Sequence, residues 1–519
     1  MALASQAAYA DNNTASTSQE GNGNLATTTQ SNLVDSDATI TQTGDNNSSE
    51  VSQANSVVGM HASVSTTGND NSANITQDDS YDAEATITQD GEKNQAGITQ
   101  EVWGDYSDAT ISQSGGENVA NVNQVNYSGG SSATITQFES EGASALIQQY
   151  NADNSSASIE QSNYVGKTGN GAEIQQHDGY SLDASIVQES TVNDTALIDQ
   201  TGFSQTASIH QKNYNVRGDT AITQTGNDNL AEIDQTWSGG SSAAVIQAGN
   251  DNVAGIDQYN SDDSSADIDQ NGSSLVANIS QKNAPGVGQG KGNDADIIQS
   301  GDSNESVIMQ DGYRNTAMVT QGDTNNEALV DQTGNDNEAT VNQTGDGQFA
   351  DVDQAGDLNK ANVTQEGGSN EVIVFQEADS NSATVGQTGT EQLAKVEQTG
   401  NTNTATATQA DFSSEAYITQ GGNDNRATVG QSGDDQYAIV NQSGAFNEAG
   451  ILQSAELNTA SVTQSGDYNF ADIDQSGTSN QAFIDQSGAG MVGSLNSAII
   501  SQSASMDYAL ITQTGGAGN

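Results

Sequence analysis

The chain contains no cysteine, a single proline and only 10 basic residues, whereas 69 of its 519 residues are acidic. The absence of cysteine excludes a disulfide framework and any thiolate metal site. The resulting net charge of −59 argues against nucleic acid and anionic membranes as partners, because both are negatively charged themselves. No run of 18 or more apolar residues is present, so we expect no membrane-spanning helix and no membrane insertion.

Apolar residues are also scarce, at 32% of the chain, against about 45–50% in an ordinary globular domain. Low hydrophobicity with high charge is typical of disorder unless the sequence repeats. Glutamine occupies every eleventh position from Gln299 to Gln486, and equivalent positions on both sides bring the total to 44 units. The repeat covers nearly the whole chain and therefore predicts an ordered fold.

The spacing of the repeat distinguishes a β-solenoid from a helix. From Gln19 to Gln161, with Gln148 taken as one of the closing glutamines, short steps of 11 residues alternate with steps of 12 or 13. One inserted residue would rotate the face of a helix by roughly 100°, whereas a turn absorbs it. The structural period is therefore two units, which indicates a flattened coil with two strands.

Each unit also carries a strand pattern, Ala-x-Ile/Val-x-Gln, in which alternate residues share one face. Glycine two residues after the glutamine, and Asn or Asp soon after it, favour a tight turn. We therefore predict an all-β fold, a parallel two-sheet β-solenoid of about 22 coils with two strands per coil. Its stacking in register is amyloid-like.

An inward glutamine is tolerated only if its amide is paired. We expect each amide to donate to the carbonyl of the next rung, as in the ladders of cross-β structures, and inward asparagine to do the same. Alanine and valine should fill the thin core between the sheets. The predicted structural residues are Gln299, Gln310, Gln321, Gln332, Gln343, Gln354, Gln365, Asn337, Ala339 and Val341.

The repeat divides the chain into four parts. Residues 1–10 are either the remnant of an export signal or the first strand, and 11–281 form a solenoid of alternating short and long half-coils. Residues 282–298 contain the only proline and are predicted to be an extruded loop. Residues 299–519 form a regular solenoid of 11-residue half-coils.

Two segments, QTGNDNEATVNQ (332–343) and QTGNDNLAEIDQ (224–235), carry the pattern Q-x-G-x-x-N-x-A-x-x-x-Q, as does QEGNGNLATTTQ (19–30). This pattern resembles the curlin repeat, the unit of bacterial curli fibres, over essentially the whole chain. The resemblance implies a β-solenoid subunit of a secreted amyloid fibre in the biofilm matrix, with a nucleator and a secretion machinery as further partners. The chain departs from the family in its length, its acidity and the presence of the motif in both strands of every coil.

Neither end of the repeat array shows a device for covering a strand edge, so we expect copies to join head to tail. The predicted function is that of a structural subunit of an extracellular, cell-surface fibre, with no cofactor and no enzymatic activity. His61, His177 and His210 are scattered through different coils without metal-ligand spacing.

The outward residues suggest lateral contacts and alternative functions. A broken apolar stripe is predicted to form a lateral contact, either between protofilaments or with another matrix component, through Leu329, Phe375, Tyr417, Ile439 and Phe483. Stacked Thr-x-Thr pairs such as Thr86 and Thr88 suggest instead a monomeric ice-binding or surface-binding solenoid. The many outward acids suggest a third hypothesis, weak calcium binding in a calcium-dependent adhesin.

Overall fold

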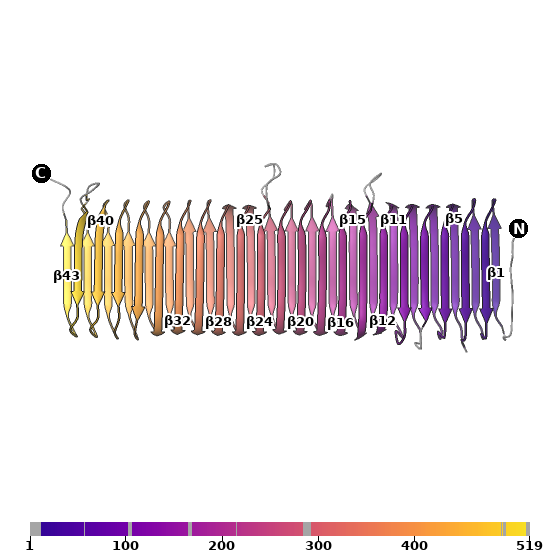
Figure 1. Cartoon of the computed structure of the whole chain (residues 1–519), viewed down its shortest axis with the longest axis horizontal. Coiled ribbons are helices and arrows are strands. Elements are labelled where there is room, and N and C mark those ends of the chain that lie inside the picture. The colour runs from indigo at the N-terminus through magenta and orange to yellow at the C-terminus, as the bar shows by residue number, and fades with distance from the viewer. Residues whose placement is uncertain are drawn as a thin grey trace. The chain divides into compact units, whose positions relative to one another are not determined.

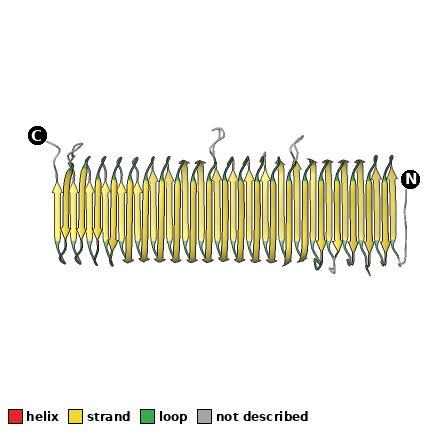
Figure 2. Ribbon diagram, in the orientation of Figure 1, coloured by secondary structure: helices red, strands yellow, loops and turns green. Residues whose placement is uncertain are grey.

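The computed structural model describes residues 12–56, 58–101, 106–163, 169–213, 215–283, 292–488, 490 and 495–514. Every regular element in these residues is a β-strand, 43 in all (Figure 2). Within this part of the chain, no helix is long and apolar enough to cross a membrane. The chain divides into two compact units, Met1–Gln270 and Asn271–Asn519, and β22 (Ser265–Ser273) contains the point of division.

The strands form because the repeat alternates apolar and polar residues with a period of two. In β28 (Glu338–Asp346), Ala339, Val341 and Gln343 are buried between the sheets, whereas Thr340 and Asn342 lie on the outer face. The same alternation recurs in nearly every strand. The core of each unit is therefore a layer of alanine and Ile or Val side chains, closed along one side by glutamine.

In unit 1, odd-numbered strands form one parallel sheet and even-numbered strands form the other (Figure 1); we call these the odd sheet and the even sheet. The odd sheet contains β1 (Thr14–Glu20), β3 (Asp37–Thr43), β5 (His61–Asn69), β7 (Glu84–Glu92), β9 (Asp108–Gly116), β11 (Ser132–Glu141), β13 (Ser156–Asn163), β15 (Asp183–Thr191), β17 (Thr206–Lys212), β19 (Leu230–Thr236) and β21 (Val253–Tyr259). The even sheet contains β2 (Leu25–Ser31), β4 (Ser48–Ala54), β6 (Ser72–Asp78), β8 (Gln95–Glu101), β10 (Val119–Val125), β12 (Ser144–Asp153), β14 (Gly171–Tyr180), β16 (Thr195–Phe203), β18 (Asp219–Asn227) and β20 (Ser242–Asn250).

Unit 2 is wound in the same way, with an odd and an even sheet of its own. Its odd sheet contains β23 (Val276–Lys282), β25 (Glu305–Tyr313), β27 (Glu327–Asn335), β29 (Phe349–Ala355), β31 (Glu371–Glu377), β33 (Leu393–Gln398), β35 (Glu415–Gln420), β37 (Tyr437–Gln442), β39 (Thr459–Gln464), β41 (Gln481–Gln486) and β43 (Tyr508–Gln513). Its even sheet contains β24 (Asp294–Asp302), β26 (Thr316–Thr324), β28, β30 (Lys360–Gly368), β32 (Ser382–Thr390), β34 (Thr404–Phe412), β36 (Arg426–Ser432), β38 (Glu448–Gln453), β40 (Asn469–Gln475) and β42 (Asn496–Gln502).

Each strand pairs in parallel with the next strand of its sheet, and equivalent residues of the repeat face each other. Val341 of β28, for example, pairs with Val319 of β26 and Val363 of β30. The predicted all-β, parallel two-sheet β-solenoid is therefore confirmed. It has about 21 turns instead of about 22. The predicted first strand, in residues 1–10, lies outside the described residues.

Two sequence-based boundaries were wrong. The predicted loop 282–298 is shorter, because Lys282 ends β23 and residues 294–298 belong to β24, whose Ala295 and Ile297 alternate inward like those of any other unit. Of the residues between these strands, 284–291 lie outside the described part. In β12, Gln149 and not Gln148 is the closing glutamine, because Gln149 lies two residues after the inward Ile147. The two half-coils on either side of β12 are therefore 12 residues each.

The turns after many closing glutamines place glycine at a close backbone approach, although Ala378 and Asp411 occupy the same position in other turns. Gly334 has a φ of 114°, and a Cβ atom at this position would lie 2.0 Å from the carbonyl oxygen of Gly356 in the next turn. No side chain fits in this space, and the left-handed backbone also favours glycine. Glycine at position 334 therefore permits the close stacking of these two turns.

Candidate functional site

The most ordered polar feature of the molecule is a column of stacked glutamine side chains along each sheet. The Gln332 amide is buried, and its Oε1 accepts a hydrogen bond from Nε2 of Gln310 at 2.9 Å. Its Nε2 donates to Oε1 of Gln354 at 2.8 Å and to the carbonyl oxygen of Thr316, which begins the facing strand β26, at 3.1 Å. Both amide protons are thus used, so the amide is buried without an unpaired group.

The seven glutamines singled out in the sequence lie in two separate columns of unit 2. Gln310, Gln332 and Gln354 belong to the odd sheet. The other four belong to the even sheet, where three successive bonds measure 2.8, 2.8 and 2.9 Å from Gln299 through Gln321 and Gln343 to Gln365. Ala339 and Val341 lie beside this second column and are fully buried.

Every bond of these columns has the same polarity. The Nε2 atom of each glutamine donates to the glutamine one turn further along the chain, from Gln281 to Gln513 in the odd sheet of unit 2 and from Gln299 to Gln502 in the even sheet. Unit 1 shows the same direction in both of its sheets. One edge of each column therefore presents amide protons and the other presents carbonyl oxygens.

Asn337 stacks in a different way from the one predicted. Its Oδ1 accepts a hydrogen bond from the backbone N–H of Asn359 at 2.9 Å, and its Nδ2 donates to the carbonyl oxygen of Gly356 at 2.8 Å. Asn337 does not make the expected amide-to-amide bond, although Asn469 of the same turn column does make one, to Asn447 at 3.0 Å. Backbone groups leave the strand ladder in the turn and need partners.

Glutamine takes the place of asparagine at some positions of this turn column, and the substitution leaves an unpaired oxygen. The buried Oε1 atoms of Gln205, Gln348, Gln392 and Gln436 have no hydrogen-bond partner. Gln348 still donates through Nε2 to the carbonyl oxygen of Gly367 at 3.2 Å. The longer side chain therefore keeps the donor function of asparagine but loses its acceptor function.

Among the described residues of unit 1, the glutamine column of the odd sheet is interrupted at Thr66. Thr66 pairs with Gln42 on one side and with Gln89 on the other, and it is 1% exposed. Its hydroxyl oxygen and the Oε1 of Gln89 are both buried without a partner. Gln42 turns its Nε2 to the hydroxyl of Ser49 at 2.9 Å instead. A missing glutamine in the column thus leaves one neighbour, Gln89, with an unpaired oxygen and redirects the amide of the other, Gln42.

The first and last described strands expose positions that are buried elsewhere. In β43, Ala509, Ile511 and Gln513 are only half-buried, and in β1 Ala15 and Thr17 are exposed. Within the described residues, β43 pairs only with β41 and β1 only with β3.

The predicted apolar stripe lies on the outer face of the odd sheet of unit 2. Leu329, Tyr417, Ile439 and Phe483 share one row, whereas Phe375 lies in the adjacent row. Asp351, Lys395 and Ser461 interrupt the first row. Burial and a hydrogen bond to Glu415 raise the pKa of Tyr417 to about 12, so its hydroxyl stays protonated.

Carboxylates crowd the same outer face. Partial burial raises the pKa of Asp331 and of Asp353, and repulsion from neighbouring acids adds to both shifts. Asp351 lies two residues before Asp353 on β29, opposite Leu329, and burial raises its pKa too. Across the described residues, no three His, Cys, Asp or Glu side chains come together in a way that could hold a metal ion.

One acid is buried instead of outward. Asp194 takes the asparagine position of the turn before β16, is 0% exposed, and accepts a hydrogen bond from the backbone N–H of Gly218 at 2.7 Å. Its second oxygen has no partner. Burial raises its pKa to about 7, against the opposing effect of the Gly218 hydrogen bond.

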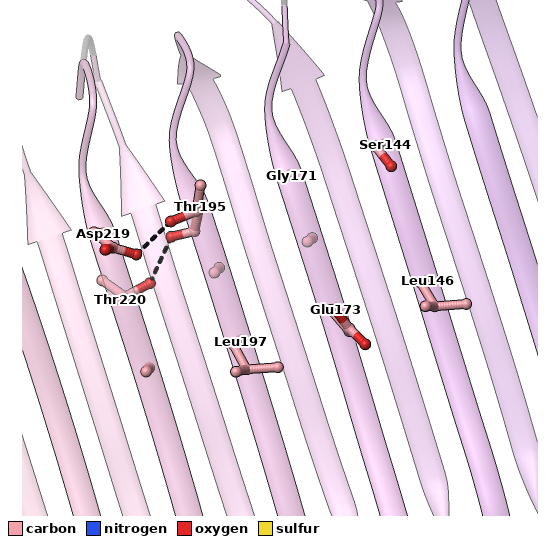
Figure 3. Close-up of a pocket in the computed structure, with 11 residues that line it drawn as sticks. Ser144, Leu146, Gly171, Glu173, Thr195, Leu197, Asp219 and Thr220 are labelled. Carbon is pink, nitrogen blue, oxygen red and sulfur yellow. Dashed lines mark hydrogen bonds between the residues drawn. The ribbon is translucent and has the colours of Figure 1, made fainter.

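A shallow depression of about 390 Å³ lies on the outer face of the even sheet of unit 1, over β12, β14, β16 and β18 (Figure 3). Sequence reasoning missed it, although an outward glycine, Gly171, was a readable signal because it leaves the face open. Leu146, Glu173 and Leu197 cross its floor, and Thr195 hydrogen-bonds Asp219 at its edge (Figure 3). The depression is open to solvent and brings no catalytic set together.

Comparison with known proteins identifies the repeat. The family described as the curlin associated repeat matches ten segments. Two lie near the N-terminus, at residues 35–78 and 82–115, and eight form a nearly continuous series at residues 290–322, 324–356, 334–367, 356–389, 378–410, 413–444, 433–466 and 466–490. Together these segments cover slightly more than half of the chain. No curated protein matches it significantly. With its two-sheet β-solenoid fold and repeated curlin segments, the chain belongs to the curlin-repeat family, as a structural protein of the curli type.

Proposed function

We propose that this protein is a structural subunit of an extracellular, curli-like amyloid fibre of the biofilm matrix, in which copies join head to tail. In each joint, β43 and β42 of one copy add in parallel to β1 and β2 of the next. Strand addition of this kind uses backbone hydrogen bonds for affinity and side-chain register for specificity. A heterologous contact that repeats without closing gives an open filament.

The polarity of the glutamine columns is the observation that carries this proposal. Among the described residues, Gln513 and Gln502 donate only to the backbone carbonyls of Ser497 and Gln481 and lack the bond to a further glutamine. At the other end, Gln19 and Gln30 donate forward, and their Oε1 atoms accept no ladder bond within the described part. The protons at one edge are thus complementary to the oxygens at the other.

The register of the joint follows from the repeat. Aligning Gln513 with Gln19 places Ala509 beside Ala15 and Ile511 beside Thr17, by the same pairing that β41 makes with β43. In the even sheet, the same alignment continues the column from Gln502 to Gln30. Each joint would then add about a dozen backbone hydrogen bonds and two side-chain bonds.

Two matched variants of β43 test the joint. Ile511 points between the sheets, whereas its neighbour Leu510 points outward and is 56% exposed. Ile511→Lys should abolish elongation, because an unpaired charge would be buried in the joint. Leu510→Lys adds the same charge on the outer face and should leave elongation nearly unchanged.

The measurements are thioflavin fluorescence, electron microscopy and fibre diffraction of full-length protein diluted from denaturant. The wild type should give filaments with a spacing near 4.8 Å along the axis. Ile511→Lys should stay monomeric and should cap wild-type filaments when added in excess. A wild type that remains monomeric at high concentration, or equal elongation of the two variants, would refute the proposal.

A second candidate function rests on the outer face of the odd sheet of unit 1. Thr86, Thr110 and Thr134 stand in register in one row, and Thr88 lies beside them two residues along β7. Such a flat array of hydroxyl and methyl groups suits binding to an ordered surface such as ice. Thermal hysteresis that Thr86→Tyr or Thr88→Tyr abolishes, without any filaments, would favour this function over the fibre.

A further inference from the structure

The outer face of the even sheet of unit 2 carries no net charge between β26 and β36. On these six strands, the outward residues from the start of each strand to the residue after its closing glutamine include two acids, Glu338 and Glu366, and two bases, Lys360 and Arg426. The others are threonine, serine, asparagine, glycine, alanine and one methionine. We call this surface the neutral face.

The opposite face of the same unit is strongly acidic. The six strands from β27 to β37 present one lysine, Lys395, and eight acids at the corresponding positions: Glu327, Asp331, Asp351, Asp353, Glu371, Glu377, Glu397 and Glu415. Two copies of a chain with a net charge of −59 repel each other over most of their surface. The neutral face is a surface on which they can approach without like charges meeting.

The charges of the neutral face are arranged so that the face is complementary to itself. Glu338 in β28 and Arg426 in β36 occupy equivalent outward positions, each two strands away from β32. A two-fold axis along β32 reverses the order of the strands and therefore brings Glu338 of one copy opposite Arg426 of the other, twice. Lys360 then faces Thr404, so no like charges oppose each other between β26 and β38.

Arg426 distinguishes this axis from its neighbours. Lys360 already pairs with Glu338 in its own chain at 2.7 Å, whereas Arg426 forms no ion pair among the residues that the structure describes. An axis along β34 would place Arg426 opposite Ser382, so that its nearest carboxylate would be that of Glu448, the adjacent residue of β38 in its own chain. An axis along β30 would bring Asp294 opposite Arg426, but it would oppose Lys360 and Glu366 to themselves. The axis along β32 is the one of the three that places a carboxylate of the other copy opposite Arg426 without opposing like charges.

The area available is that of a standard specific interface. A contact that is symmetric about β32 extends from β26 to β38, and β38 adds one outward acid, Glu448, which faces Thr316 of the other copy. These seven strands span about 30 Å at about 4.8 Å per strand. Seven residues of each strand span about 20 Å. Each copy would therefore contribute about 600 Å², or about 1,200 Å² in total, at the lower limit of stable protein interfaces. The small side chains permit the close approach seen between paired β-sheets.

We propose that two copies of this protein pair face to face through the neutral face, with antiparallel solenoid axes and a two-fold axis along β32 through Thr384 and Gly386. The contact is isologous, since each copy contributes the same surface. It does not depend on head-to-tail joining, so it can form between soluble chains or between neighbouring filaments. Its two Glu338–Arg426 pairs fix the register.

Single cysteines test the axis directly, because the natural chain has none. Thr384→Cys lies on the axis and should be linked to its own copy by a short bis-maleimide, giving a covalent dimer on a denaturing gel. Thr428→Cys lies about 19 Å from its own copy, four strand spacings away, and should not be linked to itself. A mixture of Thr428→Cys with Thr340→Cys should be linked, because the axis brings these two positions together.

Three outcomes would overturn the proposal. Self-linking at Thr406→Cys in place of Thr384→Cys would move the axis to β34. Linking at Ile373→Cys alone would assign the contact to the apolar row of the odd sheet. No linking at any of these positions, with every cysteine reactive towards a mono-maleimide, would show that neither face mediates pairing between copies.

Charge reversal gives an independent test in the background of Thr384→Cys. Arg426→Glu should lower the linked fraction about tenfold at low salt, because two attractive pairs become repulsive. Adding Glu338→Arg should restore it. Lys395→Glu makes the same change of charge on the acidic face and should have no effect. Filaments without linking would refute the pairing and leave the fibre function standing, and linked dimers without filaments would do the reverse.

Discussion

Repairing the interrupted glutamine column at Thr66 is expected to stabilise unit 1. In the Thr66→Gln variant, the new Oε1 can accept from Gln42, and the new Nε2 can donate to the Oε1 of Gln89 and to the carbonyl oxygen of Ser48, as the geometry of neighbouring rungs indicates. Two buried oxygens that now lack partners, the hydroxyl of Thr66 and the Oε1 of Gln89, would be removed or satisfied. A column of continuous bonds would then run through β3, β5 and β7.

The size of the effect follows from these contacts. A buried hydrogen bond contributes about 1 kcal/mol, and an unpaired buried acceptor costs about 1–3 kcal/mol. The bond from Gln42 replaces its present bond to Ser49, so the net gain comes from the new bond to Gln89, which satisfies the Gln89 acceptor. We expect a local gain of about 1–3 kcal/mol. Every 1.4 kcal/mol is a factor of ten, so amide hydrogen exchange in β5 should slow by about 5- to 150-fold wherever it proceeds through local opening.

Hydrogen exchange is the suitable assay because repeat proteins open in parts, and one global unfolding energy is not defined for them. Thr66→Leu is the matched control, since it adds a side chain of similar size without an amide and so measures packing alone. Thr66→Val removes only the unpaired hydroxyl. If Thr66→Gln protects β5 no better than Thr66→Leu, the amide column does not contribute the energy assigned to it.

Three further predictions concern the turns. In the wild type, the folded pKa of Asp194, about 7, lies above the ordinary 3.8, so the free energy of unfolding around this turn should depend on pH. The stability is fully present below about pH 4 and is lost, by on the order of 4 kcal/mol, as the pH rises through 7. Asp194→Asn should remove this dependence. Hydrogen exchange of β16 at pH 5 and pH 8 measures this, and equal pH dependence in the variant would contradict it. Gln348→Asn should stabilise the turn that contains residue 348 by about 1–2 kcal/mol, seen as slower amide hydrogen exchange there. The shorter side chain can accept a hydrogen bond from the backbone N–H of Asn370, as Asn337 does from Asn359. Gly334→Ala should lower the protection of the β27 amide hydrogens against exchange by the equivalent of about 2 kcal/mol or more. Gly368→Ala, whose added Cβ would lie 3.6 Å from its nearest neighbours, should be nearly neutral in the same measurement on β30.

The fold could be predicted because the residue pattern within each unit and the spacing between units both indicate the same structure. The period-two alternation of Ala, Val and Gln in segments such as 339–343 sets the inward face, and the variable step length excludes a helix. The placement of Gln299 to Gln365 followed from the same pattern, since an inward amide has few other ways to be satisfied.

Three details could not be predicted by counting glutamines. Gln148 and Gln149 are adjacent, and only their position relative to the inward Ile147 decides which one enters the column. Asn337 follows the same period as the glutamines, but its partner is set by the curved backbone of the turn, which the sequence does not display. The neutral face became visible only when the registers of alternate strands were known, because Glu338 and Arg426 are distant in sequence.

The near-identity of the turns in unit 2 has a consequence for folding. Eighteen glutamines at equal intervals allow many alternative strand registers, each displaced by a multiple of 22 residues. In each of these registers, every inward residue still pairs with a residue of the same type. Core packing therefore does not favour one of these registers over another. The features that distinguish one register from another are irregular: the unequal lengths of the half-coils in unit 1, the missing glutamine at Thr66 and the particular charges on each outer row. Features that interrupt the repeat are therefore what select a single strand register during folding.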